Sequence, residues 1–242
     1  MSYKTATRVL GLPARLARKA LPDGALEQLS FEVRSMFGRR SARRLRLDPA
    51  RTNLLDLGAA DTPAGDFIAI DFFGRKGVYG ADLRYPLLVD DASVDGIFTE
   101  HTFEHLAFDD VRRLAGECFR VLKPGGRIRV VVPDVSIFVA RYQANDLAWF
   151  REWERVTLLP RGRALVTPMQ ALSFITQEYG HRSAWDFTSL AKVLGDAGFT
   201  DVEAAAYRRG RDARLLRDKD ADSRRLVSLY AEAVKPAAPA GA

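Results

Sequence analysis

Apolar positions in this chain alternate between a helical spacing and short strand-like runs from about residue 53 onward. The clearest unit has helical spacing over residues 109–122 and ends in Lys123-Pro124-Gly125-Gly126, where glycine allows the chain to leave a helix. A Val-rich run follows and ends in Pro133-Asp134. A short continuous apolar run is typical of a strand that is buried on both faces. The unit therefore predicts a helix followed by a central strand of an α/β sheet.

The same alternation predicts seven strands. Their expected ranges are 53–57, 67–71, 78–81, 94–99, 127–132, 201–206 and 228–234. The last two strands are expected to form a hairpin, after a capped helix over residues 186–199. Only eight residues separate Gly58 from Phe67, whereas a crossover that includes a helix needs about 10–12 residues. The first crossover is therefore predicted to contain no full helix.

Three units are predicted along the chain. Residues 1–51 form a basic helical arm, with helices over 8–20 and 25–47 and Asp23 as the cap of the second. Residues 52–235 form the main domain, in which 135–185 is an aromatic-rich helical insertion after the fifth strand. Residues 236–242 form a disordered tail.

Charge is concentrated in the arm, which holds 12 Lys and Arg against 4 Asp and Glu, while residues 52–242 hold 25 against 27. Six arginines crowd the second predicted helix. They are Arg34, Arg39, Arg40, Arg43, Arg44 and Arg46. Such an arm suits contact with an anionic lipid surface, an anionic glycan or nucleic acid. We favour a helical lid with a solvated charged face, because aromatic residues for base stacking are sparse in the arm.

Composition narrows the class of protein further. The chain is 47% hydrophobic and has 242 residues, enough for one α/β domain. No apolar run reaches the roughly 18 residues of a membrane span, and Pro13 and charged residues interrupt the pattern of a signal peptide. A single cysteine, Cys118, forms neither an internal disulfide nor a cysteine zinc cage. These features predict a cytoplasmic protein.

Chemistry-bearing residues follow several of the predicted strands. In an open parallel sheet, ligands bind beyond the carboxyl ends of the strands. Gly58 follows the first strand and allows close approach of a ligand to the backbone. Asp71 ends the second strand, where a carboxylate suits hydrogen bonding to two ribose hydroxyls. Asp82 follows the third strand and Glu100 the fourth.

These motifs together resemble the class I S-adenosylmethionine (SAM)-dependent methyltransferases. Residues 56–60 are similar to the family's acidic-hydrophobic-Gly-x-Gly motif, with Ala60 in place of the second glycine. Residues 90–98 resemble the entry to the fourth strand, and Glu104-His105-Leu106 matches the Glu-His-Leu that follows it. Residues 120–134 resemble the fourth helix, turn and fifth strand. The resemblance covers residues 53–235.

The resemblance implies an α/β, Rossmann-like class I methyltransferase sheet of seven strands with the last antiparallel. The shortened first crossover is similar to a bacterial subgroup linked to glycan and surface-polysaccharide assembly. The implied cofactor is SAM, with Asp82 facing the adenine amino group and Leu83 packing on the ring. The residues expected to hold SAM are Gly58, Ala59, Ala60, Asp71, Phe72, Asp82, Leu83 and Glu100.

Three residues are candidates for catalysis: His101, Asp134 and His181. His101 is expected at the rim where substrate and SAM meet, where an imidazole that titrates near neutral pH suits a general base. Asp134 and His181 compete for the role. His105 is interpreted as a structural residue. No metal site is predicted, because His101 and His105 do not carry glutamate at the position of the His-Glu-x-x-His metalloprotease pattern.

The sequence therefore predicts methyl transfer from SAM to a hydroxyl of a sugar, glycan or small molecule, with the aromatic insertion shaping the acceptor pocket. One alternative is a binding or scaffold protein of the same fold without turnover, because Ala60 and Thr62 replace glycines. Another is a nucleic-acid methyltransferase, which rests on the basic arm alone. We expect no appreciable nucleic-acid binding at physiological salt. A peripheral membrane contact through the arm, the oligomeric state and the acceptor stay open.

Overall fold

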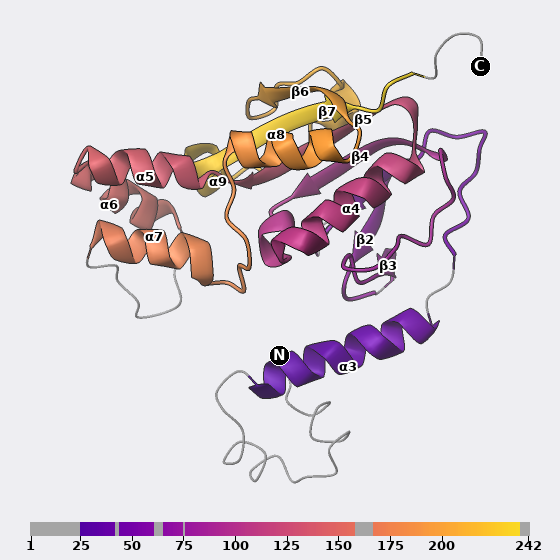
Figure 1. Cartoon of the computed structure of the whole chain (residues 1–242), viewed down its shortest axis with the longest axis horizontal. Helices are drawn as coiled ribbons and strands as arrows, with labels where there is room; N and C mark the ends of the chain where they lie inside the picture. The colour runs from indigo at the N-terminus through magenta and orange to yellow at the C-terminus, as the bar shows by residue number, and fades with distance from the viewer. Residues whose placement is uncertain (1–24, 42–43, 61–64, 75, 158–166, 238–242) are drawn as a thin grey trace.

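A mixed seven-stranded sheet forms the centre of the protein (Figure 1). The computed structural model describes residues 25–41, 44–60, 65–74, 76–157 and 167–237. The strand order is β3-β2-β1-β4-β5-β7-β6, with β1 to β5 parallel and β7 antiparallel to both of its neighbours. The strands are β1 (Leu54–Leu57), β2 (Phe67–Asp71), β3 (Val78–Gly80), β4 (Val94–Glu100), β5 (Leu122–Pro133), β6 (Thr200–Ala205) and β7 (Ser228–Val234). This confirms the predicted class I methyltransferase sheet and all seven strands.

Helices flank and extend the sheet. They are α3 (Ala25–Ser41), η1 (Phe103–His105), α4 (Phe108–Val121), α5 (Val135–Gln143), α6 (Leu147–Val156), α7 (Pro168–Gln177), α8 (Phe187–Asp196), η2 (Ala213–Leu215) and α9 (Asp222–Val227). The predicted arm helix over 8–20 and its neighbour Asp23 lie outside the described residues. The second arm helix ends at Ser41 rather than Leu47, because the Leu45 N–H donates to the Leu88 carbonyl at 2.8 Å instead of to a helical carbonyl.

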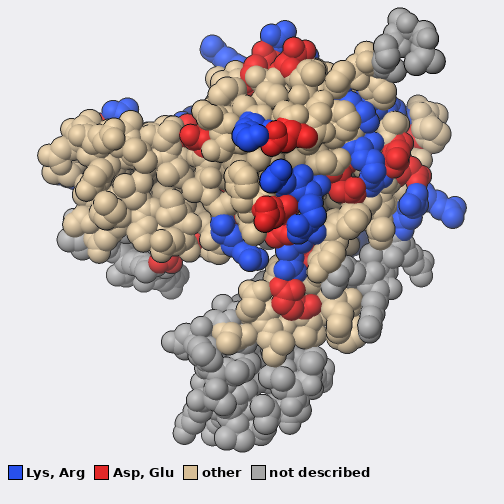
Figure 2. Space-filling model, viewed as in Figure 1, with Lys and Arg blue, Asp and Glu red and all other residues tan. Residues whose placement is uncertain are grey.

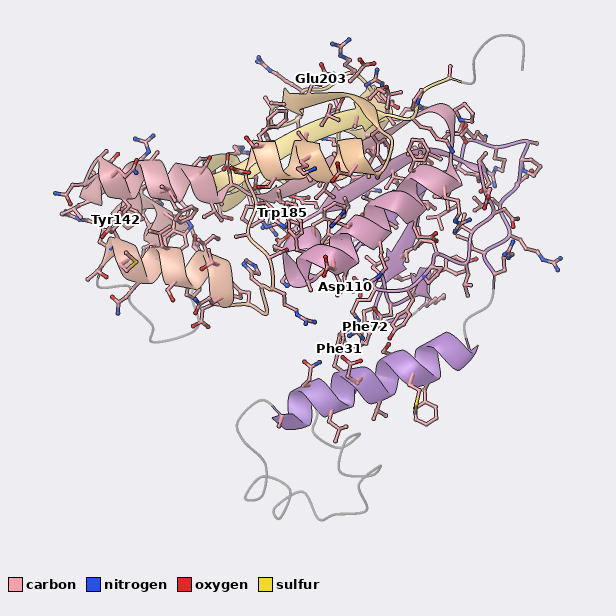
Figure 3. All side chains as sticks on the ribbon, viewed as in Figure 1. Phe31, Phe72, Asp110, Tyr142, Trp185 and Glu203 are labelled. Atoms are coloured by element: carbon pink, nitrogen blue, oxygen red, sulfur yellow. The ribbon has the colours of Figure 1, made fainter. Side chains whose placement is uncertain are left out.

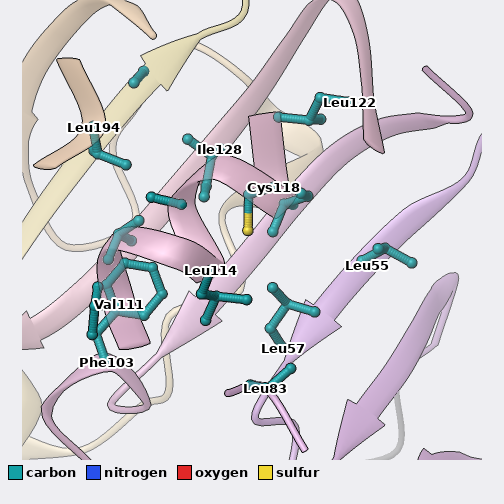
Figure 4. Close-up of a cluster of buried hydrophobic side chains, with 14 of the residues drawn as sticks. Leu55, Leu57, Leu83, Phe103, Val111, Leu114, Cys118, Leu122, Ile128 and Leu194 are labelled. Atoms are coloured by element: carbon teal, nitrogen blue, oxygen red, sulfur yellow. The ribbon is translucent and has the colours of Figure 1, made fainter. Parts of the chain in front are cut away.

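Alternation along β5 explains how the sheet is covered on both faces. Ile128, Val130 and Val132 pack into the main core with α4 and α8, which lie on the same face of the sheet (Figures 1 and 4). Arg129 and Val131 point to the opposite face, since successive strand residues alternate. Both faces of β5 are therefore buried, as its continuous apolar run predicts.

The connection from β6 to β7 covers the opposite face. Its Leu215 is fully buried against Leu54 and Phe98. A Cβ on Gly96 would lie 3.0 Å from the Leu215 side chain, so this close packing depends on the absence of a side chain at position 96. The strands β6 and β7 pair antiparallel, but residues 206–227 with η2 and α9 join them. The predicted pairing of the last two strands is therefore confirmed, and the long connection between them covers the sheet.

A buried ionic cluster fixes this connection to the sheet. Arg129 donates to Asp218 at 2.6 and 2.8 Å and to Glu232 at 2.8 Å, and all three residues are at most 1% exposed. The Arg129 guanidinium also donates to the Ala206 carbonyl at 2.8 Å. Burial without these partners would be very costly for the three charges. The cluster therefore determines where residues 206–227 lie.

The described residues of the first crossover contain no helix, as its short length predicts. Residues 58–60 and 65–66 are not helical, and the predicted residues Asp61 and Thr62 lie outside the described part of the chain. The N–H groups of Gly58 and Ala59 both donate to the Ile70 carbonyl, at 2.8 and 3.2 Å. These bonds hold the turn after β1 directly against the end of β2.

The helices α5, α6 and α7 form a lobe beyond one end of the sheet (Figure 1). Its core is aromatic, with Phe138, Phe150, Trp153 and Phe174 buried together. The face of the lobe shown in Figure 2 carries few charged side chains, whereas the region around α4 carries many of both signs. Among the described residues, no helix is both long and apolar enough to cross a membrane.

Candidate active site

The turns after β1 and β4 meet at the carboxyl end of the sheet. Gly58 has a φ of 79°, a region that favours glycine. A Cβ at Gly58 would lie 1.9 Å from the Thr102 hydroxyl oxygen. That hydroxyl lies 3.2 Å from the carbonyl oxygens of Leu57 and Glu100, both acceptors. Gly58 therefore allows the two strand-end turns to pack in contact.

Asp71 organises the turn after β1 through its carboxylate. One oxygen accepts from the Ala60 N–H at 3.0 Å, and the other accepts from the Phe73 N–H at 3.1 Å. Ala60 has a φ of 47°, so the alanine that replaces the second glycine still adopts the left-handed conformation. The predicted residues Gly58, Ala60 and Asp71 therefore come together at adjacent strand ends. Ala59 is buried beside them.

Asp82 contacts the N-terminal helix. Its carboxylate accepts from the Ser35 hydroxyl of α3 and from the Arg84 guanidinium, which also donates to Glu32 of α3 at 2.7 Å. Burial by itself would raise the pKa of Asp82, but the hydrogen bonds from Arg84 and Ser35 outweigh it and lower that pKa. Asp82 is therefore ionised near neutral pH.

Aromatic stacking adds to the same contact. Phe31 of α3 stacks on Phe72 with ring centroids 4.1 Å apart and planes 10° apart (Figure 3). The Arg84 guanidinium lies 4.8 Å from the centre of the Phe31 ring. The helix α3 thus packs on the ends of β2 and β3 through one ring pair and one ionic group.

A cavity of about 730 Å³ lies between α3 and the ends of β2 and β3. Its wall includes Ile70, Phe72 and Asp82 on the sheet side and Arg34 and Ser35 on α3. Cavities of about 300–1,000 Å³ with apolar walls and a few polar groups are typical ligand sites. Leu83 was expected to face the cofactor, but it is only 8% exposed and packs in the main core instead.

Two further carboxylates lie at the strand ends. Burial raises the pKa of Asp56 to about 6, with Glu100 and Asp71 adding to the rise and Arg217 opposing it. Burial also raises the pKa of Glu100, one of whose oxygens accepts from the Lys219 N–H at 3.0 Å. The predicted residue Glu100 is thus mostly buried and held by the connection from β6 to β7.

His101 was expected at an open rim, but its side chain is only 10% exposed. Its Nε2 lies 2.9 Å from the Ser228 hydroxyl, and its Nδ1 contacts the Arg224 guanidinium. Burial lowers the pKa of His101 well below its usual range, and Arg224 adds to this effect. The ring is therefore neutral and enclosed, because residues distant in sequence cover it.

Three other side chains gather beside His101, and we call Glu104, His105 and His181 the Glu104 cluster. One possible ligand atom from each of the three lies within 4.8 Å of the others. The rings of His105 and His181 have centroids 5.0 Å apart. Burial raises the pKa of Glu104, and burial lowers the pKa of His105. Glu104 is 1% exposed, while His105 is exposed, so the cluster opens to solvent on one side.

Backbone hydrogen bonds hold the segment that carries His181 against η1. The Glu104 carbonyl accepts from the N–H groups of Arg182 and Ser183, at 2.7 and 3.2 Å. The Ser183 hydroxyl donates to the Phe103 carbonyl at 3.1 Å. The cluster is thus supported by the main chain on both sides.

Asp134 has a structural role in this arrangement. Its Oδ1 accepts from the Ser136 N–H at 3.0 Å and from the Ser136 hydroxyl at 2.6 Å, which caps the start of α5. Asp134 also forms a bridge with Trp185, which brings the segment after His181 alongside the end of β5. The structure therefore brings His181 to the Glu104 cluster beside His101 and uses Asp134 at a helix end.

Sequence reasoning overlooked Glu104 and His105 as a pair with His181. His101, Glu104 and His105 follow the His-x-x-Glu-His spacing of one class of zinc enzyme. This spacing is the sequence signal that could have found the pair. The contacts of Ser35 and Glu32 with the end of β3 had no signal in the sequence.

Comparisons with known proteins indicate a methyltransferase. A family model described as a methyltransferase domain matches residues 71–130. A curated demethylmenaquinone methyltransferase from Listeria welshimeri is 24% identical, over 76% of this chain and 85% of its own length.

Among solved structures, an Archaeoglobus fulgidus SAM-dependent methyltransferase is 14% identical with a TM-score of 0.45, covering 88% of this chain and 100% of its own. A Haemonchus contortus phosphoethanolamine N-methyltransferase 2 with bound SAM is 13% identical with a TM-score of 0.44 and 83% of this chain covered. This chain spans about half of that nematode protein, 51% of its length.

The sheet order is that of the class I methyltransferase fold, and the match of a methyltransferase domain over residues 71–130 indicates the enzyme class. The protein is a methyltransferase and its cofactor is SAM. The residues present fit that cofactor: the cavity has an apolar wall that ends in the ionised Asp82, and Gly58 keeps the neighbouring backbone close to the end of β2.

Proposed function

We propose that this enzyme methylates a hydroxyl group of a sugar, a glycan or another small molecule. The observation that carries the proposal is the Glu104 cluster, which lies directly after β4 and opens to solvent at His105. A hydroxyl that is methylated loses its proton, and a half-open group of one carboxylate and two imidazoles is suited to receive it. SAM supplies the electrophilic methyl group when it is bound.

The strand-end carboxylates are proposed to hold SAM. Asp71 would accept from the ribose hydroxyls, and Asp82 would accept from the adenine amino group. Gly58 and Ala59 would border the cofactor with backbone atoms, and Phe72 would contribute to the apolar wall. Glu100, which is buried and bonded to the Lys219 N–H, would instead hold the turn after β4 in place.

Exposed aromatic faces next to the cluster support a sugar as acceptor. Tyr179 is 49% exposed, and its ring centre is 6.2 Å from that of His181. Phe108 is 44% exposed and stacks on Trp185 at 5.1 Å. The C–H faces of sugars pack on such rings, while the hydroxyl groups turn to polar partners. Most other rings of the aromatic insertion form the core of the α5–α7 lobe.

His101 is proposed to act as a positioning residue. Its two ring nitrogens contact Ser228 and Arg224, and its Nδ1 lies 3.2 Å from Glu104 Oε1. The ring thus places Arg224 next to the carboxylate of the Glu104 cluster. His181, whose ring borders the open side, is the proposed catalytic histidine.

Titration calorimetry with SAM tests the cofactor site. Asp71→Ala removes charge-assisted hydrogen bonds worth about 1.5–3 kcal/mol each. SAM affinity should therefore fall about tenfold or more. Asp66→Ala, at an exposed position just before β2, is the matched control and should leave affinity unchanged. Equal affinity of a folded Asp71→Ala variant and the wild type would refute the assignment.

A methyl-transfer screen tests the acceptor. Sugars and nucleotide sugars are the expected acceptors, and aromatic diols should be included because the Listeria relative is named for demethylmenaquinone. Binding of SAM with no transfer to any acceptor would favour the alternative of a binding protein without turnover. Nucleic acid forms the third arm of the screen, and tight binding of RNA or DNA at physiological salt would overturn the sugar proposal.

A further inference from the structure

The Glu104 carboxylate is buried without a hydrogen-bond partner. Its side chain is 2% exposed, and neither of its oxygens accepts a hydrogen bond. A buried carboxylate in this condition is costly unless it is paired, protonated or bound to a cation. An ionised Glu104 therefore needs a positive partner, and a bound cation is one way to provide it.

The neighbouring His101 does not meet this need. The Arg224 guanidinium only donates, so His101 Nδ1 accepts there and its proton is on Nε2, next to the Ser228 hydroxyl. His101 Nδ1 then faces Glu104 Oε1 at 3.2 Å with a lone pair rather than a proton. Two acceptors therefore meet at this point when Glu104 is ionised, and the ionised carboxylate has no hydrogen-bond donor here.

His181 is oriented as a metal ligand would be. Its Nδ1 lies 2.6 Å from the Ile175 carbonyl oxygen, which only accepts, so the ring proton is on Nδ1. The lone pair of the neutral ring is therefore on Nε2. Metal-binding histidines commonly donate their second nitrogen to a backbone carbonyl in this way. His105 also has a hydrogen bond with the Gly180 backbone.

We propose that the Glu104 cluster binds a divalent transition-metal cation, with Zn²⁺ as the best match. Glu104, His105 and His181 supply one oxygen and two imidazole nitrogens, the ligand set of catalytic zinc sites with one open position. Mg²⁺ and Ca²⁺ prefer oxygen ligands alone. The exposed side at His105 leaves the fourth position open to solvent and substrate.

The distances allow such a site after a small adjustment. The ligand atoms lie within 4.8 Å of one another, whereas zinc–ligand bonds of about 2.0–2.1 Å place tetrahedral ligands about 3.3 Å apart. Rotation of His105, which is exposed and on the short helix η1, can close the difference. Glu104 and His181 are fixed by backbone hydrogen bonds on either side.

The proposed metal site rests on the proposed function. It adds a role in which the cation activates the acceptor hydroxyl. A hydroxyl at the open position binds the cation through its oxygen and becomes more acidic. Its O–H bond breaks, the electron pair stays on oxygen, and the proton passes to water on the exposed side. In this case His181 acts as a ligand rather than as the base itself.

Metal content of the full chain tests the inference. The purification tag is removed, the protein is treated with a chelator, and Zn²⁺ binding is measured by calorimetry and elemental analysis. We expect one Zn²⁺ per chain. Glu104→Gln, His105→Ala and His181→Ala should each weaken binding at least about 100-fold. Glu152→Gln, an exposed carboxylate on α6, is the matched control and should bind zinc like the wild type.

The visible spectrum of the Co²⁺-loaded protein gives a readout that is independent of activity. A tetrahedral or five-coordinate spectrum is expected, and it should be lost in His105→Ala, whose exposed position makes it the variant that folds most readily. No zinc binding by the wild type, or equal binding by all three ligand variants, would overturn the site. Full methyl transfer in the presence of a chelator would refute the role of a metal, and it would not contradict the proposed methyltransferase activity.

Discussion

At the residue scale, the strand-end acids show how burial sets protonation. Burial raises the pKa of Asp56 from 3.8 to about 6. Its stabilising contribution is therefore complete below pH 3.8 and is lost as the pH rises through 6. The loss corresponds to about 3 kcal/mol, because one pKa unit is about 1.4 kcal/mol.

Asp56→Asn tests this assignment through stability. The variant carries no ionisable group at this position, so its stability relative to the wild type should increase by about 2.5 kcal/mol between pH 4 and pH 8. Urea unfolding at both pH values measures the change. A difference between variant and wild type that is the same at the two pH values would contradict the raised pKa.

Gly58 tests the contact between the turns after β1 and β4. Gly58→Ala places a Cβ 1.9 Å from the Thr102 hydroxyl and adds a side chain at a φ of 79°. We expect a loss of about 2–4 kcal/mol in unfolding free energy, together with weaker SAM binding. Thermal and urea unfolding measure the first effect.

Gly116→Ala is the control for the same substitution. Gly116 is within α4 and has no heavy atom within 4 Å of its would-be Cβ. Alanine there should stabilise the protein by about 0.5–1 kcal/mol. Equal effects of the two changes would mean that the contact with Thr102 does not matter.

At the scale of elements, α3 forms one wall of the cavity that we propose as the SAM site, as a lid would. It is held there by the stacking of Phe31 on Phe72 and by the contacts of Ser35 and Glu32 with Asp82 and Arg84. The arm was predicted to be a basic helical lid. Among the described residues, its contacts with the domain come from an acid, a hydroxyl and a ring, and also from two of its clustered arginines, Arg34 beside Phe73 and Arg44 beside Asp90.

Phe31→Ala tests the lid. Loss of the stacked pair should weaken the contact between α3 and the rest of the domain by about 1–3 kcal/mol. Bound SAM should then dissociate several-fold faster, measured by stopped-flow displacement. Met36→Ala, an exposed position on α3, is the control and should leave the rate unchanged. An unaltered rate in Phe31→Ala would mean that α3 does not retain the cofactor.

At the scale of the whole molecule, the buried Arg129 cluster links the two layers of the fold. Asp218→Ala leaves Arg129 with one fewer carboxylate in a fully buried position. We expect a loss of about 3–5 kcal/mol in stability. Glu152→Gln breaks only an exposed pair and should cost less than about 1 kcal/mol. Comparable losses in urea unfolding for the two variants would contradict the role of the cluster.

The sequence by itself determined the sheet. Local apolar periodicity predicts the strand ranges and the short first crossover. Sequence motifs that resemble the methyltransferase family, such as residues 120–134, predict the antiparallel last strand. Gly58, Asp71 and Asp82 were also located correctly at strand ends, because a strand boundary fixes which residues lie at the carboxyl edge of a parallel sheet.

Only the tertiary structure decided what surrounds these residues. His101 is enclosed by Ser228 and Arg224, and Glu104 and His105 meet His181, although these partners are far apart in the sequence. Leu83 turned to the core because its side-chain direction depends on the packing of the turn after β3. Periodicity records which face of an element is buried, but the path of residues 206–227 and of the segment around His181 depends on the packing of the whole chain.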